Sequence, residues 1–228
     1  MKRAIIYVAW GDRFAREAES AYCNSDPIHK YPAYLITDSN VGTYAGFEDV
    51  IRPTNPAPGK RMKAEALACH LPEGYDSYLF LDTDTRVVED AELGFQKAEK
   101  HGIAMAPAPF YSLADFHGFS RVMEAEGVAP IGQQLYNSGV VFFSPSEKVK
   151  TVLSMWFALM RKYDEKQTDQ PYLTLAMEQQ GVHPYALSRS WNYRAFGEMV
   201  AGDVYIWHSR RPVPTDVNTY HCAWPRTF

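Results

Sequence analysis

The stretch YLFLDTDTRVVED, residues 78–90, places two carboxylates, Asp82 and Asp84, directly after a run of apolar residues. At the end of a buried strand, the triplet Asp-Thr-Asp has two interpretations. Asp and Thr are common turn and capping residues, so the triplet can close the strand and have no further role. Carboxylate oxygens are also the ligands that Mg²⁺ and Mn²⁺ prefer, so the same triplet can hold a divalent cation. The surrounding sequence has to distinguish the two.

Strand-like and helix-like patterns alternate through the first 82 residues, which is typical of an open α/β sheet with parallel central strands. Such sheets bind ligands beyond the carboxyl ends of their strands. Trp10, Asp38 and the Asp82-Thr83-Asp84 corner all fall at those ends. The expected elements are strands at 4–10, 32–38, 49–53 and 77–82, and helices at 12–23 and 60–70.

The second half of the chain is less regular, and no internal repeat or low-complexity linker divides it from the first. We therefore expect one domain over residues 1–228, built on a mixed, mostly parallel sheet flanked by helices. Its expected elements are helices at 88–102, 146–166 and 171–181, strands at 103–109 and 135–146, and short strands or extended pieces at 182–188, 190–194 and 203–209.

Composition excludes several function classes. The chain has 228 residues, 46% of them apolar, and a net charge of −4 with no long basic block, so nucleic acid is not an expected partner. Its three cysteines are far apart and form no CxxC pair, which indicates neither a disulfide framework nor a zinc site. No apolar run approaches the ~18–20 residues of a membrane helix. We expect a soluble, cytoplasmic protein that could still visit a membrane surface.

One catalytic alternative is a Mg²⁺-dependent phosphatase of the haloacid-dehalogenase type, with Asp82 as the nucleophile of a DxDx(T/V) motif. The motif's last position is Arg86 here rather than a hydroxyl residue or valine. The later acidic pair is missing, because Gly202-Asp203 has no second Asp at a suitable distance. The motif also normally follows the first strand of its fold, whereas this one follows about the fourth.

The other alternative is sugar transfer from a nucleotide-diphosphate donor. The departing diphosphate is strongly anionic, and a hard cation held by one or two carboxylates and bridging both phosphates neutralises its charge. The sugar meanwhile develops oxocarbenium character, as in glycoside hydrolysis. Catalysis then consists mainly of positioning the donor and stabilising the departing diphosphate.

The stretch YLFLDTDTRVV resembles the DxD strand of the GT-A fold glycosyltransferases, most of all the retaining group that includes glycogenin and the bacterial lipopolysaccharide galactosyltransferases. The resemblance extends from residue 4 to 212, with the matching segments in the family's order. They are AIIYVAW (4–10), LITD (35–38), GKRMKAEAL (59–67), LYNSGVVFFSP (135–145), TDQPYLTLAM (168–177), SRSWNYR (188–194) and IWHSRRP (206–212).

The resemblance implies a metal site for Mn²⁺ or Mg²⁺ formed by Asp82, Asp84 and His208. Asp82 would also touch the ribose of the donor, with Thr83 beside it. Without the resemblance, a lone histidine next to Trp207 would be interpreted as an ordinary core or surface residue. The family's organisation further implies a nucleotide-binding half at about 1–88 and a donor-sugar and acceptor half at about 89–228.

The resemblance also implies which residues bind the nucleotide-sugar, a UDP-sugar being favoured. Asp38 could equally be a plain strand-end turn residue, and the basic helix at 60–70 could be a solvated face on which only one or two cations are functional. The implied contacts are Ala9, Trp10 and Asp38 for the base and ribose, Lys60, Arg61 and Lys63 for the phosphates or donor sugar, and Arg210 and Arg211 for the diphosphate.

In the second half, Asn137 and Ser138 are expected to meet the sugar hydroxyls, with Gly139 allowing close backbone approach. Asp169 and Gln170 are expected below the anomeric carbon, where a carboxylate or amide could steady the cation-like sugar. The simpler interpretations are a strand-entry turn for the first three residues and an N-cap for Asp169, which is compatible with a catalytic role.

Two departures from the family pattern bear on the donor. Relatives carry a glycine and a lysine soon after the late histidine, whereas this chain has Ser209-Arg210-Arg211-Pro212, in which an arginine would have to replace the lysine. Relatives also carry an acidic residue between the DxD and N-(A/S)-G segments, for which only Asp115 or His117 is at hand. The resemblance favours retention of configuration and a hydroxyl acceptor on a glycan or glycoconjugate. A catalytically idle GT-A-like domain that binds only nucleotide or carbohydrate is the non-enzymatic alternative.

Overall fold

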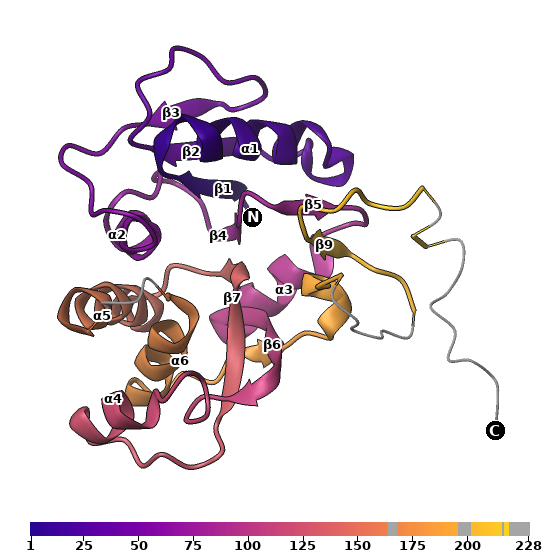
Figure 1. Cartoon of the computed structure of the whole chain (residues 1–228). Coiled ribbons are helices and arrows are strands. Elements are labelled where there is room, and N and C mark those ends of the chain that lie inside the picture. Colours follow the sequence, from indigo (N-terminus) through magenta and orange to yellow (C-terminus); the bar gives the residue numbers. More distant parts are fainter. Residues whose placement is uncertain (164–167, 196–201, 216, 219–228) are drawn as a thin grey trace, which may run out of the picture.

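The structure, a computed structural model, describes residues 1–163, 168–195, 202–215 and 217–218. A seven-stranded sheet in the order β3-β2-β1-β4-β7-β6-β8 forms its centre (Figure 1). The pairings from β3 to β4 and between β6 and β8 are parallel, and β7 is antiparallel to both neighbours, so the predicted mixed, mostly parallel sheet is confirmed. The strands are β1 Arg3–Ala9, β2 Ala33–Thr37, β3 Asp49–Ile51, β4 Ser77–Leu81, β6 Ile103–Ser112, β7 Gln134–Phe143 and β8 Tyr185–Ala186.

Helices cover both faces of this sheet. Successive residues of β1 point to opposite faces, and both sets are buried: Ile6 and Val8 belong to one core, and Ile5 and Tyr7 to the other. This double burial is why the strand is apolar throughout. The first core is covered by α2 (Arg61–Cys69), α4 (Ser120–Ala125), α5 (Glu147–Tyr163) and α6 (Gln170–Gln179), and the second by α1 (Gly11–Cys23) and α3 (Glu92–His101).

A separate two-stranded sheet lies beside the main one and was not predicted as a pairing. It joins β5 (Thr85–Val87) to β9 (Ile206–His208) in antiparallel register, with Thr85 opposite His208 (Figure 1). The chain therefore brings a segment from near its C-terminus directly alongside the residues that follow the Asp-Thr-Asp corner.

The predicted helix at 88–102 is wrong in its first turn. The backbone N–H groups of Val88 and Glu89 both donate to the carbonyl of Tyr205, which extends the β5–β9 pairing into this region. The helix begins at Glu92, whose N–H donates to the carboxylate of Asp90 at 2.7 Å. The contact to Asp90, which precedes the N-cap residue Ala91, and a strand partner far away in sequence together delay the helix by four residues.

Three other segments differ from the sequence prediction. The stretch 190–194, expected to be extended, contains most of a 3₁₀ turn over Arg189–Asn192, in which the N–H of Trp191 donates to the carbonyl of Ser188. The helix α4 and a 3₁₀ turn at Asp26–Ile28 were not predicted.

None of the helices in the described part of the chain is long and apolar enough to cross a membrane.

Candidate functional site

The Asp-Thr-Asp corner is a tight turn fixed to its neighbours. β4 ends at Leu81, and the N–H of Asp82 continues the sheet by donating to the carbonyl of Gly139 at 2.8 Å. The carbonyl of Asp82 then accepts from both the N–H and the hydroxyl of Thr85, at 3.2 and 2.7 Å. These bonds reverse the chain between β4 and β5, so that the carboxylates of Asp82 and Asp84 turn toward one cluster.

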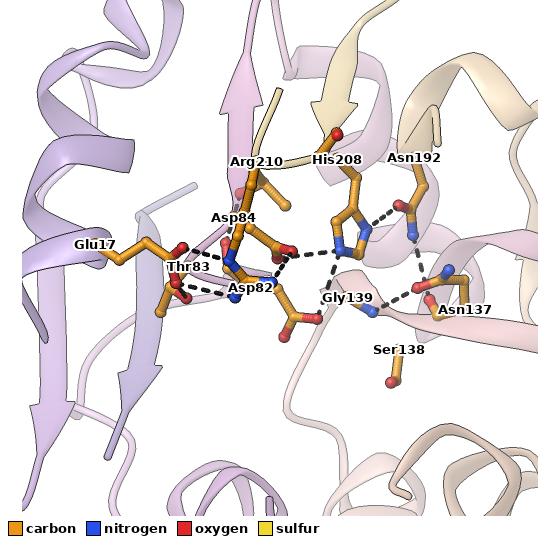
Figure 2. Close-up of polar contacts among 12 residues, drawn as sticks. Glu17, Asp82, Thr83, Asp84, Asn137, Ser138, Gly139, Asn192, His208 and Arg210 are labelled. Carbon is orange, nitrogen blue, oxygen red and sulfur yellow. Dashed lines mark hydrogen bonds and ion pairs between the residues drawn. The ribbon is translucent and has the colours of Figure 1, made fainter. Parts of the chain in front are cut away.

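The β5–β9 pairing supplies the third member of that cluster. The imidazole Nε2 of His208 lies 3.2 Å from Asp84 Oδ1 and 3.8 Å from Asp82 Oδ2 (Figure 2). One donor atom from each of the three residues lies within 4.8 Å of the other two. The three side chains proposed as metal ligands are therefore brought together.

The orientation of His208 is set by Asn192. The imidazole Nδ1 lies 2.6 Å from Asn192 Oδ1, while the amide nitrogen of Asn192 donates to the carbonyl of Asn137 at 3.5 Å. An amide oxygen can only accept, so Nδ1 carries a proton and Nε2 is the ring atom that faces the carboxylates. In the charged ring Nε2 donates to Asp84; once that proton is released, the lone pair of Nε2 and the two carboxylates can face one cation. Two carboxylates, one imidazole and a partner orienting the ring form a donor set that suits Mn²⁺ or Mg²⁺.

Gly139 makes room for this cluster. A Cβ at this position would collide with Cε1 of His208 and lie 2.7 Å from Oδ2 of Asp82. The glycine was expected to allow close approach of a sugar; the close approach seen here is that of two prospective metal ligands. A side chain at 139 would force them apart.

Asp84 is held as a carboxylate. Burial alone would raise its pKa, but the hydrogen bond and charge of His208, together with the charge of Arg210, shift the pKa of Asp84 well below its ordinary value. The group is therefore anionic at neutral pH, as a metal ligand must be.

A buried ionic cluster lies next to the corner. The ammonium of Lys63, a side chain only 4% exposed, contacts Asp82 Oδ1 at 2.9 Å, Asp169 Oδ2 at 2.7 Å and Ser138 Oγ at 3.2 Å. Ser138 also donates to Asp169 at 2.6 Å. Burial lowers the pKa of Lys63, but the charges of Asp169 and Asp82 raise it above its ordinary value overall. Burial likewise raises the pKa of Asp169, and the charges of Lys63 and Lys60 outweigh it and lower that pKa.

Asp169 does not cap α6 with its side chain, although it occupies the N-cap position. Its carboxylate is turned away from the helix, toward Lys63 and Ser138. The simpler interpretation of Asp169 as a helix cap is therefore wrong.

These groups line a pocket of about 270 Å³. A second pocket of about 350 Å³ adjoins it, sharing Lys60, Asn137, Asp169, Gln170 and Arg194, and adds an apolar wall of Ala108, Pro109, Tyr111 and Phe116. The first pocket is lined by Val8, Trp10, Phe14, Lys60, Lys63, Asp82, Thr83, Asp84, Asn137, Ser138, Asp169, Gln170, Arg194, His208 and Arg210.

Several expected contact residues do not line either of these two pockets. Ala9 is fully buried in the sheet, and Asp38 accepts a hydrogen bond from the N–H of Gly11 at 2.5 Å, at the start of α1. Arg211 lines a separate pocket of about 310 Å³ together with Asp84 and His208. Asp115, considered for the donor sugar, accepts from Ser112 at 2.6 Å and is not among the lining residues of either main pocket.

Sequence reasoning missed three residues of the site. Asn192 and Arg194 belong to a segment, SRSWNYR, that was recognised as a whole without a role for either side chain. Glu17 was not considered, yet it accepts from Thr83 Oγ1 at 2.6 Å and pairs with Arg210. The only signal for Glu17 in the sequence was a carboxylate on the helix predicted at 12–23, which is too common to be informative.

No protein-family model matches the chain, and no curated protein does. Among solved structures, the galactosyltransferase LgtC, crystallised with donor and acceptor sugar analogues, is similar over 92% of this chain and 87% of its own, with a TM-score of 0.65 and 15% identity. Mouse xyloside xylosyltransferase 1 is similar over 94% of this chain and 100% of its own, with a TM-score of 0.61 and 13% identity. The glycosyltransferase GlyE of Streptococcus pneumoniae is similar over 97% of this chain and 57% of its own, with a TM-score of 0.60 and 17% identity. At these identities the likeness is one of fold, and it confirms the expected GT-A fold.

Proposed function

We propose that this protein is a metal-dependent glycosyltransferase that moves a sugar from a nucleotide-diphosphate sugar, favoured to be a UDP-sugar, to a hydroxyl of a glycan or glycoconjugate. One observation carries the proposal. Asp82, Asp84 and His208, from segments more than 120 residues apart, converge at the carboxyl end of β4 beside a pocket rich in polar groups. Ligands of open α/β sheets bind at such strand ends.

Asp82, Asp84 and His208 would hold Mn²⁺ or Mg²⁺, and Asn192 would keep Nε2 of His208 directed at the ion. The bound ion would supply neutralisation of the negative charge on the departing diphosphate. Arg210, half-exposed above Asp84, and Lys60, also half-exposed, are the cations best placed to contact phosphate oxygens.

Lys63 has a different role from the one first considered. Its ammonium is enclosed by Asp82 and Asp169 and is almost inaccessible, so we assign it to orienting those carboxylates rather than to gripping phosphate. Asn137, Ser138, Asp169 and Gln170 then form the wall against which the donor sugar would lie.

Retention of configuration fits this arrangement better than inversion. Inversion needs a general base near the acceptor hydroxyl, and Asp169 is the carboxylate nearest both pockets. Lys63 and Ser138 both contact its Oδ2, and the charges of Lys63 and Lys60 lower its pKa despite burial, so Asp169 is a weak base. It is better suited to stabilising positive charge on the sugar.

The acceptor would enter through the second pocket. That pocket meets the first at Asn137, Asp169 and Gln170, so a molecule seated in it would present a hydroxyl next to the donor sugar. Tyr111, which is 45% exposed, and Phe116 supply an aromatic wall of the kind on which sugar rings stack. We expect Tyr111→Ala to raise the acceptor KM severalfold and to leave donor hydrolysis unchanged.

The proposal is tested by incubating the protein with UDP-sugars and following UDP release. We expect hydrolysis that requires Mn²⁺ or Mg²⁺, stops with EDTA, and falls at least about 100-fold in Asp84→Asn, since even residues that only support metal ligands are worth 10–100-fold. UDP-sugar binding without turnover would indicate the idle-domain alternative. Phosphate release from simple monoesters would indicate the phosphatase, which the position of Asp82 after β4 rather than the first strand already disfavours.

A further inference from the structure

Arg210 lies against the candidate metal centre but is held there by a residue outside it. Its Nε and one terminal nitrogen donate to both oxygens of Glu17 on α1, at 2.8 and 3.2 Å (Figure 2). The remaining nitrogen lies 3.4 Å from Asp84 Oδ2. Glu17 also accepts from the hydroxyl of Thr83, so it contacts both the middle of the Asp-Thr-Asp corner and the segment that follows His208.

This arrangement addresses an electrostatic conflict. A guanidinium is a planar donor that pairs readily with a carboxylate through two parallel hydrogen bonds. If Arg210 paired with Asp84 in that way, it would occupy the oxygens that a divalent cation needs. Glu17 instead takes the two-bond pairing, and Arg210 keeps only a longer contact to Asp84.

We propose that Glu17 is a positioning residue for the metal centre: it diverts Arg210 from Asp84 and so leaves the carboxylate free for the cation. The inference rests on the metal-dependent function proposed above. Glu17 touches neither the ion nor the substrate in this role. It acts through Arg210, and its contact to Thr83 keeps it next to the corner whose charge it protects.

The same helix offers a matched control. Glu19, two residues further on, is also a hydrogen-bonded glutamate, but it pairs with Arg16 at 2.8 Å and accepts from the N–H of Ala45. Neither contact reaches the Asp-Thr-Asp corner. A change at Glu19 therefore reproduces the loss of a helix carboxylate without disturbing Arg210.

The test is direct titration of the protein with Mn²⁺ alone, with free Mn²⁺ measured by electron paramagnetic resonance. We expect Glu17→Gln to weaken Mn²⁺ binding about tenfold, Glu19→Gln to leave it unchanged, and the double variant Glu17→Gln/Arg210→Gln to return to within about threefold of the parent protein. Circular dichroism melting without metal checks that each variant is folded.

Two results would overturn the inference while leaving the proposed function intact. One is Glu17→Gln binding Mn²⁺ as well as the parent protein does. The other is a double variant that binds as weakly as Glu17→Gln, which would mean that competition from Arg210 is not the cause. A parent protein that binds no Mn²⁺ would remove the metal centre and the inference together. Mn²⁺ binding without sugar transfer would count only against the proposed function.

Discussion

At the scale of single residues, Lys63 is a charged side chain that is almost fully buried. It is enclosed between Asp82 and Asp169, and removing it leaves the buried Asp169 carboxylate without its main partner. Breaking one side of a buried ion pair commonly costs about 3 kcal/mol or more. We therefore expect Lys63→Met to lower the free energy of unfolding by about 3 kcal/mol, measured by urea denaturation.

Lys60 provides the comparison, because it sits on the same side of the site but is 44% exposed and 3.8 Å from Asp169. Exposed pairs are worth little, so Lys60→Met should change the unfolding free energy by less than about 1 kcal/mol. Equal losses of unfolding free energy in Lys63→Met and Lys60→Met would mean that the buried ion pairs of Lys63 contribute no more to stability than the exposed contact of Lys60.

Gly139 lies against two of the three candidate metal ligands. Because an added Cβ would collide with His208 and crowd Asp82, Gly139→Ala should push two of the three ligands apart and weaken Mn²⁺ binding at least about tenfold. Gly132→Ala is the control, since a Cβ there meets nothing within 4 Å. Unchanged Mn²⁺ affinity in Gly139→Ala would show that the cluster tolerates a wider geometry than this structure has.

At the scale of elements, ion pairs connect the start of β1 to α3. Arg3 pairs with Glu99 at 2.8 Å and with Glu92, and Ser77 of β4 also donates to Glu99. The hydrogen bond from Arg3 lowers the pKa of Glu99, and lowers that of Glu92 to about 2. Since folded pKa values below the unfolded ones stabilise the protein above pH ~4.5, this contribution is lost as pH falls from there toward 2.

Glu99→Gln isolates that contribution. The variant should lose on the order of 1 kcal/mol at pH 6, and its stability should decline less steeply than that of the parent protein between pH 5 and 3, as followed by urea unfolding. Glu147→Gln, which removes a surface pair with Lys150, is the control for losing a carboxylate. Parallel stability curves for Glu99→Gln and the parent protein would contradict the assignment.

The elements also show how far the sequence predicts this fold. Long apolar runs such as 4–10 and 77–82 identified their strands to within a residue or two, because burial on both faces leaves little choice of residue type. The pairing of β5 with β9 was missed because each has three residues and their partners are more than 100 positions apart. No local pattern carries that information, and the same pairing displaced the first turn of the helix predicted at 88–102.

At the scale of the whole molecule, the order of the motifs along the chain identified more of the candidate site residues than any single motif did. Asp82, Asp84 and His208 were nominated from segments in family order, and the fold brings them together. Glu17 and Asn192 could not be nominated in the same way, because their roles depend on which side chains face them across the site.

Binding across this site should also stabilise the whole protein. A ligand that binds only the folded state raises the unfolding free energy by mass action, by about 2.7 kcal/mol at 100 times its Kd. Because the cation and the diphosphate would each neutralise the other's charge, UDP with Mn²⁺ should raise the melting temperature more than either alone or their sum. A shift equal to the sum of the separate shifts would count against a shared site.

The most direct measurement is a crystal structure with UDP and Mn²⁺, with data collected at a wavelength where manganese scatters anomalously. We expect one strong anomalous peak within about 2.0–2.4 Å of the Nε2 atom of His208 and of a carboxylate oxygen from each of Asp82 and Asp84. We also expect diphosphate oxygens to complete the coordination. A bound UDP with no manganese peak between these three side chains, or a peak held by other residues, would rule out the proposed metal centre.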